Sequence, residues 1–331
     1  MKAIGVRALY RAARVADREA PYDNITLKIH YPCEYGDSFE ERDTGFIPPD
    51  GARAPFPVVI VMPGINVSHE AYGWVAKELA RAGFAAVTYS WVTVEIGDLV
   101  SISPGVALDA LHRQRYGEAP SCPALPAILG ELGRMQRESL LAGQLNLDRI
   151  VLGGHSAGGT MALVNANADW VPGIRGAFAY AAHTAGNLQL GWPEDSIMPL
   201  SRALPLLVMG GTRDGVIAAS GHRYRDARGD DPDDRIERTF REGIGGDGGG
   251  RHLLMVSGAN HFSFAWPRDT TTGRPYLDGK ARGGGKRLRG YIADLVVNFC
   301  RRVCMGDAGA AAAFAALCNP GHPLAAVAET K

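Results

Sequence analysis

Apolar runs of strand length recur along this chain, and most are separated by segments with the spacing of an amphipathic helix. The runs lie at residues 56–62, 84–90, 150–153, 176–182, 204–209 and 252–257. Continuous runs of this length predict strands that are buried on both faces. Residues 24–31 alternate apolar and polar side chains instead, which predicts a half-exposed strand near a sheet edge.

The segments between these runs carry apolar residues on one helical face. Residues 68–82, 125–135 and 288–303 show this pattern most clearly. A strand, helix, strand order with short joints predicts a mostly parallel sheet covered by helices. We therefore expect an α/β protein with about eight strands, helices on both faces of the sheet, and a single domain over residues 1–331.

Two segments are longer than the joints of such a sheet require. Residues 91–121 and 184–203 each follow a predicted strand and contain several aromatic and proline residues. Long insertions at strand ends often shape a binding site, so we expect both to cover or line a pocket. For residues 91–121, a long surface loop that lines no pocket is an equally good interpretation. Residues 305–331 form an alanine-rich C-terminal tail, for which a short helix is predicted.

Composition narrows the classes of partner. The 331 residues are 46% hydrophobic and include 35 basic and 35 acidic side chains, which predicts a large core and no general attraction to nucleic acid or anionic membranes. No stretch approaches the roughly 18 apolar residues of a membrane helix, so we expect no membrane span and a cytoplasmic location. The five cysteines form no C-x-x-C pair, which predicts reduced thiols, although a bridge involving Cys318 stays open. Cys300 and Cys304 lie one helical turn apart, which could supply at most two metal ligands, so we expect no metal site. The oligomeric state is left undetermined.

The strongest chemical signal is the segment 154–158, which reads Gly-His-Ser-Ala-Gly and fits the pattern G-x-S-x-G. It follows a short apolar run and precedes a plausible helix. A sharp strand-to-helix turn would project the Ser156 hydroxyl, and side chains two residues to either side would collide there. Small residues are therefore a steric requirement of such a turn. The alternative interpretation is an ordinary glycine-rich joint between a strand and a helix.

Ser156 needs a base and an orienting carboxylate to act as a nucleophile. Asp214 and His261 each follow a predicted strand, as Ser156 does. The carboxyl ends of parallel strands lie at one edge of a sheet, so these three side chains are expected to converge. The alternatives are a turn-forming role for Asp214 and a surface-loop position for His261. His155 is interpreted as a packing or hydrogen-bonding residue.

Acyl transfer also requires donors for an oxyanion. The N–H of Ala157 at the serine turn is one candidate, and the N–H of Ile65 is the second, because Gly64 allows the backbone to approach closely. A plain turn at residues 63–64 is the alternative. Substrate-lining roles are expected for Trp91, His183 and Trp192. Trp91 and Trp192 lie within the two long segments, and His183 follows a predicted strand directly before the second of them.

Over roughly residues 22–304 the chain resembles the α/β-hydrolase superfamily, and within it the branch of dienelactone hydrolases, chlorophyllases and platelet-activating-factor acetylhydrolases. The likeness depends on four segments, namely 57–64, 147–159, 211–214 and 260–264. It implies the α/β-hydrolase fold, with Ser156 as nucleophile, Asp214 as acid and His261 as base. The resemblance also implies oxyanion donors at Ile65 and Ala157.

Two positions depart from that pattern. Pro63 stands where relatives commonly have histidine, and Ser156 stands where dienelactone hydrolases have cysteine. An ordinary ester is thus expected in place of a dienelactone. The predicted activity is a serine hydrolase acting on a small carboxylic ester without any cofactor. The alternatives are a thioesterase, transacylase or peptidase with the same triad, or a noncatalytic binding protein of the same fold.

Overall fold

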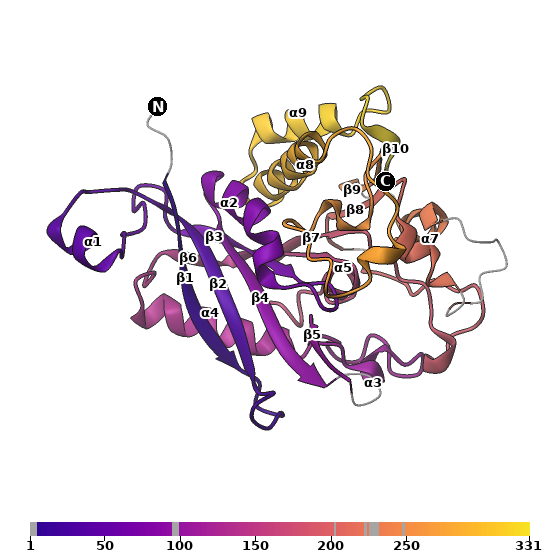
Figure 1. Ribbon diagram of the computed structural model, residues 1–331, viewed down its shortest axis with the longest axis horizontal. Helices are drawn as coiled ribbons and strands as arrows, with labels where there is room; N and C mark the ends of the chain where they lie inside the picture. Colours follow the sequence, from indigo (N-terminus) through magenta and orange to yellow (C-terminus); the bar gives the residue numbers. More distant parts are fainter. Residues whose placement is uncertain (1–4, 95–98, 202, 222–223, 225–231, 247–248) are drawn as a thin grey trace.

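The chain forms an α/β structure around one mixed, mostly parallel sheet of ten strands (Figure 1). The computed structural model describes residues 5–94, 99–201, 203–221, 224, 232–246 and 249–331. Its strands are β1 (Gly5–Arg14), β2 (Asn24–Cys33), β3 (Phe56–Met62), β4 (Ala85–Val94), β5 (Val100–Ser103), β6 (Leu145–His155), β7 (Ile174–Tyr180), β8 (Leu206–Gly211), β9 (Arg251–Val256) and β10 (Ala325–Thr330).

The sheet is parallel in its centre and antiparallel at its two edges. Its order is β1-β2-β4-β3-β6-β7-β8-β9-β10, and β5 pairs with β4 outside that path. The pairs from β4 through β9 are parallel, whereas β1 with β2, β2 with β4, and β9 with β10 are antiparallel. Strands β3, β8 and β9 are buried along their whole length, as their continuous apolar sequences predict.

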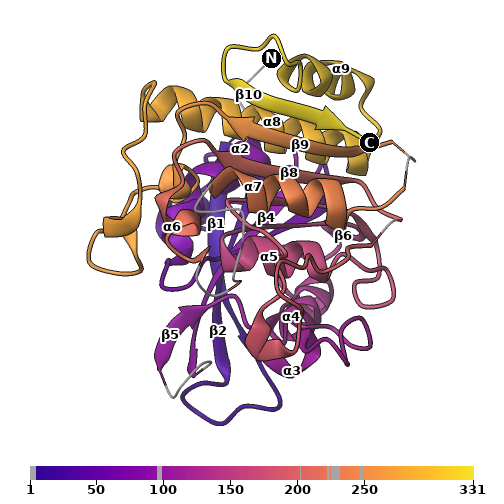
Figure 2. The same cartoon turned by 90° about the vertical axis from the view of Figure 1, so that its right-hand side faces the viewer.

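Helices cover both faces of the sheet. The longer ones are α2 (Gly73–Arg81), α4 (Ala124–Glu138), α5 (Ala157–Val164), α7 (Pro232–Arg238), α8 (Gly285–Met305) and α9 (Ala308–Leu317). Figure 2 shows α4, α5 and α7 in front of the strands and α2 and α8 behind them. The shorter helices are α1 (Phe39–Thr44), α3 (Leu108–Leu111), α6 (Gly215–Ala218), η1 (His69–Tyr72), η2 (Leu188–Leu190), η4 (Thr239–Gly243), η5 (His261–Ser263) and η6 (Pro275–Leu277). The α/β class and the helices on both faces agree with the sequence prediction.

The number of strands differs from the expected eight or so, because the sequence pattern misses β1, β5 and β10. Strands β1 and β10 lie at the two edges, and most of their residues are partly exposed. A strand that buries little of either face needs no regular apolar pattern, so its pairing is decided by the neighbouring strand. The predicted tail accordingly contains not only the helix α9 but also a strand that pairs with β9.

The two predicted insertions pack against each other. The indole N–H of Trp192 donates to the Leu111 carbonyl at 2.9 Å, and the Tyr116 hydroxyl donates to the Pro199 carbonyl at 2.7 Å. The Tyr116 and Trp192 rings form an edge-to-face pair. The two segments therefore make one packed unit, while residues 95–98 and 202 lie outside the described part of the chain. Whether this unit covers a pocket stays a prediction.

Two further sequence expectations concern the cysteines and membranes. All five cysteines are free thiols, and four of them are buried, including the pair at 300 and 304 on α8. Among the helices of the described residues, none combines the length and the apolar character needed to cross a bilayer.

His252, at the start of β9, makes stability depend on pH. Its Nδ1 lies 2.9 Å from the Thr330 hydroxyl, and its Nε2 lies 2.8 Å from a guanidinium nitrogen of Arg302. Because arginine only donates, Nε2 accepts and the imidazole is neutral. Burial, and then the Arg302 charge, lower the pKa of His252 from 6.5 to about 4.

We expect acid to destabilise the protein partly through this histidine. Between pH 6.5 and 4 the unfolded chain binds a proton at His252 that the folded chain does not, so the free energy of unfolding falls as pH falls through that window. The contribution is at most about 3 kcal/mol. Urea unfolding of the wild type and His252→Gln at pH 7 and pH 4.5 measures it. The drop in stability should be smaller in the variant, and an equal drop in both proteins would contradict the assignment.

Candidate active site

The predicted serine turn is formed where β6 ends at His155 and α5 begins at Ala157. Ser156 has φ 55° and ψ −126°, a conformation that residues other than glycine rarely adopt. Its N–H donates to the Tyr180 carbonyl of β7 at 3.0 Å, which fixes the turn against the next strand. The side chain is only partly buried. A strained backbone thus holds a serine at the corner between a strand and a helix.

The glycines around Ser156 are required by close backbone contacts. A Cβ on Gly154 would lie 2.2 Å from the Gly158 carbonyl oxygen, and a Cβ on Gly158 would lie 2.3 Å from the Met62 carbonyl oxygen. Both neighbours are main-chain atoms that cannot rotate away. The sequence argument for small residues two positions before and after the serine agrees with this geometry.

Gly154→Ala should therefore be strongly destabilising. The added methyl group must displace the start of α5, and overpacking of a tight core site costs about 1–3 kcal/mol or more. Gly290→Ala is the matched control, because Gly290 is an exposed α8 residue whose Cβ would have no neighbour within 4 Å. That control should gain up to about 1 kcal/mol. Chemical denaturation measures both, and a Gly154→Ala protein as stable as the wild type would refute the steric argument.

Asp214 and His261 form a buried pair. The Asp214 Oδ2 atom lies 2.8 Å from Nδ1 of His261, and the two side chains are 0% and 4% exposed. The other carboxylate oxygen accepts the N–H groups of Val216 and Ile217 at 3.0 and 2.9 Å, which caps α6 and fixes the carboxylate. An ionised carboxylate accepts hydrogen bonds, so Nδ1 carries the proton and Nε2 keeps its lone pair. This arrangement leaves Nε2 able to act as a base.

The histidine turn lies against the serine turn. Nε2 of His155, the residue before Ser156, is 3.0 Å from the His261 carbonyl, and the two imidazole centroids are 4.8 Å apart. Tyr180, whose carbonyl accepts from Ser156, donates its hydroxyl to the Asn260 carbonyl at 2.8 Å. Within the described part of the chain, no direct hydrogen bond joins the Ser156 hydroxyl to the His261 imidazole. Such bonds are often long in free enzymes and shorten when substrate binds.

Asp278 is a second carboxylate at this site, and the sequence reasoning missed it. Its Oδ1 accepts the N–H of His261 at 3.2 Å and of Gly215 at 3.3 Å, and its Oδ2 accepts the N–H of Phe262 at 3.2 Å. Burial raises the pKa of Asp278, and the nearby charge of Asp214 raises it further. Asp278 thus ties the base turn to the acid turn through their backbones. In the sequence it is one of two acidic residues in the glycine-rich loop before α8, and nothing in that loop distinguishes it from Asp269.

The two predicted oxyanion donors belong to different turns. Ala157 is the first residue of α5, and Ile65 lies in the turn after β3. In the described structure neither backbone N–H donates to another group of the chain. A Cβ on Gly64 would lie 3.3 Å from the Ser156 Cβ, so the β3 turn approaches the serine closely. The arrangement leaves two unpaired N–H groups near Ser156.

The three predicted substrate-lining residues have different positions. His183 follows β7, and its carbonyl accepts the hydroxyl of Thr160, one turn after Ser156, at 2.9 Å. Burial lowers the pKa of His183 to about 3, with Arg235 adding to the effect and Asp214 opposing it, so the imidazole is neutral. The contact with Thr160 places the backbone of His183 beside the helix that begins after Ser156.

Trp91 and Trp192 have other contacts. Trp91 is fully buried on β4, and its indole N–H donates to the Tyr22 carbonyl at 2.8 Å. Its ring also packs beside Gly105, and neither of these two contacts involves the Ser156 turn. Trp192 joins the two insertions, as described above. The structure therefore brings neither tryptophan into contact with the Ser156, Asp214 and His261 group.

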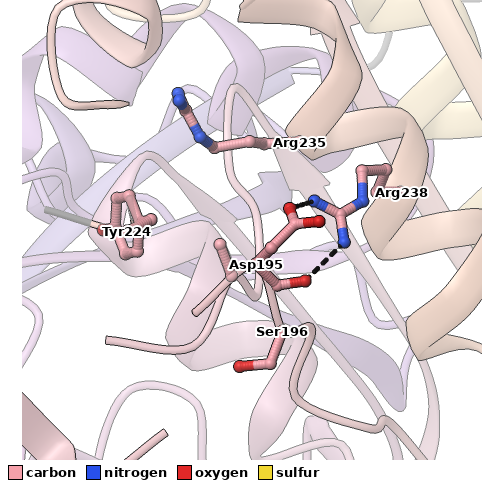
Figure 3. Close-up of a pocket in the computed structure, with 6 residues that line it drawn as sticks. Asp195, Ser196, Tyr224, Arg235 and Arg238 are labelled. Atoms are coloured by element: carbon pink, nitrogen blue, oxygen red, sulfur yellow. Dashed lines mark hydrogen bonds and ion pairs between the residues drawn. The ribbon is translucent and has the colours of Figure 1, made fainter. Parts of the chain in front are cut away.

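The structure contains a small pocket that is lined in part by Tyr224 (Figure 3). The ring of Tyr224 also contacts that of His183 edge to face. Its lining residues are Ala185, Asp195, Ser196, Tyr224, Arg235 and Arg238. Asp195 forms an ion pair with Arg238, and the Asp195 carbonyl also accepts from that guanidinium at 2.7 Å. Most of these lining residues are polar or charged, and none belongs to the predicted triad.

No protein-family model matches the chain, and no curated protein matches it.

Proposed function

We propose that this chain has the α/β-hydrolase fold and is a serine hydrolase that cleaves a carboxylic ester through an acyl-enzyme. The observation that carries the proposal is the buried hydrogen bond of 2.8 Å between Asp214 and His261, on a turn that contacts the residue before Ser156. The serine occupies a strained strand-to-helix turn, and the acid and then the base follow it along the chain, which is the order of α/β-hydrolases.

The first half of the reaction forms the acyl-enzyme. His261 Nε2 takes the hydroxyl proton of Ser156 as the oxygen attacks the ester carbonyl, and Asp214 stabilises the imidazolium. The carbonyl oxygen becomes an oxyanion that accepts the N–H groups of Ile65 and Ala157. Each such donor is typically worth about 3–4 kcal/mol of barrier. When the intermediate collapses, His261 gives its proton to the alcohol, which leaves.

The second half releases the acid. His261 removes a proton from a water molecule, the hydroxide attacks the acyl carbon, and the same two N–H groups bind the second oxyanion. Collapse returns the proton to Ser156 and frees the carboxylic acid. These steps use only side chains, backbone N–H groups and water. His183, whose carbonyl accepts from Thr160 one turn after Ser156, is the residue that we expect to line the substrate site beside the triad.

A substrate panel tests the proposal. The purified chain is incubated with p-nitrophenyl butyrate, an acyl thioester and a peptide p-nitroanilide, and separately with a fluorophosphonate probe followed by mass spectrometry. We expect one probe adduct per chain and fastest turnover of the oxygen ester. Faster turnover of the thioester or the peptide would reassign the substrate class. A folded protein that forms no adduct would instead be a noncatalytic binding protein.

A further inference from the structure

A chain of buried hydrogen bonds connects three turns of the candidate site through two residues outside the triad. The N–H of Gly64 lies 2.9 Å from the Tyr72 hydroxyl, and that hydroxyl lies 3.0 Å from Nδ1 of His155. Nε2 of His155 then lies 3.0 Å from the His261 carbonyl. The side chains of Tyr72 and His155 are both fully buried. Water therefore does not compete for these bonds.

Only one assignment of donors and acceptors satisfies this series of hydrogen bonds. A carbonyl accepts, so Nε2 of His155 must carry the proton and donate to His261. Nδ1 must then accept from the Tyr72 hydroxyl, whose oxygen accepts the Gly64 N–H. Burial holds the pKa of His155 well below its usual value, with the nearby His261 adding to the effect, so the ring is neutral as this pattern requires. Every donor and acceptor in this series of hydrogen bonds is therefore paired.

The three connected turns are the ones that the proposed reaction needs. Gly64 precedes the oxyanion donor Ile65, His155 precedes the nucleophile, and His261 is the base. The turns follow strands β3, β6 and β9, so nothing local in the sequence sets their spacing. A Cβ on Gly64 would lie 3.0 Å from Nδ1 of His155, which shows how closely the first turn is held to the second.

We propose that Tyr72 and His155 are positioning residues that set the distance between the oxyanion donor at Ile65, the nucleophile Ser156 and the base His261. This inference rests on the proposed function. Oxyanion stabilisation depends on donors that are already aimed before charge develops, so a displaced Ile65 N–H slows the chemical step more than it weakens ground-state binding. A misplacement of about 1 Å can cost on the order of 100-fold in rate.

Tyr72→Phe removes the hydroxyl and keeps the ring, which packs 5.9 Å from both His155 and Phe264 between centroids. The matched control is Tyr31→Phe. Tyr31 is also buried and donates its hydroxyl to a backbone carbonyl, that of Ile47, at 2.8 Å, but it lies on β2 and its hydrogen bond joins none of the three turns. Both variants lose one buried hydroxyl, and Tyr72→Phe should lose more thermal stability because it leaves two buried groups unpaired, the Gly64 N–H and Nδ1 of His155.

The experiment measures kcat and KM for p-nitrophenyl butyrate, with active sites counted by fluorophosphonate titration so that only folded, reactive protein is compared. We expect Tyr72→Phe to lower kcat by about 10- to 100-fold with little change in KM. Tyr31→Phe should keep the kcat of the wild type. His155→Gln is the second variant. Its loss in kcat should not add to that of Tyr72→Phe in the double variant, because both substitutions break the same series of hydrogen bonds.

Any result other than these expected ones contradicts a specific claim. Equal kcat values for Tyr72→Phe and Tyr31→Phe, or additive losses in the double variant, would refute the positioning role while the hydrolase proposal stands. A rise in KM without a fall in kcat would also refute it. A folded wild-type protein without a fluorophosphonate adduct at Ser156 would refute the proposed function, and the positioning role with it.

Discussion

Ser156→Ala should abolish both fluorophosphonate labelling and ester turnover, with kcat lower by at least about 1,000-fold. The hydroxyl at this turn is the nucleophile of the step that forms the acyl-enzyme. Removing it leaves His261, Asp214 and the two N–H donors without a group that forms the acyl-enzyme. Stability should change little, because the Ser156 side chain makes no hydrogen bond within the described structure.

The control for this variant is Ser38→Ala. Ser38 also precedes a helix, α1, where its hydroxyl accepts the Glu41 N–H at 3.1 Å. Its loss should cost about 1 kcal/mol of stability and no activity. The two variants are compared by labelling, by p-nitrophenyl butyrate turnover and by thermal unfolding. Labelling that persists in Ser156→Ala at the wild-type rate would show that another residue is the nucleophile.

Asp214→Asn should lower kcat by about 10,000-fold while the fold is kept. The amide can still cap α6 through the N–H groups of Val216 and Ile217. It cannot accept from Nδ1 of His261 and also stabilise a positive imidazole. The histidine then favours the tautomer with its proton on Nε2, which is no longer available to take the Ser156 proton.

Asp307→Asn is the matched control for the acid. Asp307 caps α9 by accepting the Ala310 N–H at 2.9 Å, as Asp214 caps α6, but its other contact is an arginine and not a histidine. Turnover should be unchanged in Asp307→Asn, and both variants should unfold cooperatively. An Asp214→Asn protein with near wild-type kcat would mean that His261 is not oriented by this carboxylate.

The candidate site shows where sequence reasoning succeeds. The serine turn has a local signature, because a tight strand-to-helix corner excludes side chains at positions 154 and 158. Asp214 and His261 are predicted from their places after buried strands, whose continuous apolar sequences can be recognised one at a time. The structure brings these two side chains together across 47 positions of sequence. Their catalytic roles stay predictions that the variants above test.

The same reasoning fails for residues whose function depends on distant partners. Tyr72 has only the pattern of an apolar helix position, and its hydroxyl finds His155 83 residues away. Asp278 looks like a loop residue until its carboxylate is seen to accept from the His261 turn. Trp91 is predicted to line a pocket; in the structure it is fully buried on β4, where its indole N–H donates to the Tyr22 carbonyl, and its substrate role stays a prediction. Nothing in the local sequence distinguishes these cases.

By itself the sequence determined the α/β class, the buried central strands and the steric character of the Ser156 turn, because each depends on residues that are neighbours along the chain. Only the tertiary structure decided that β1, β5 and β10 join the sheet, and which buried polar groups pair around His261. Edge strands bury too little surface to need a pattern of their own. A buried hydrogen bond is specified by two segments that meet only after folding, so neither segment alone records it.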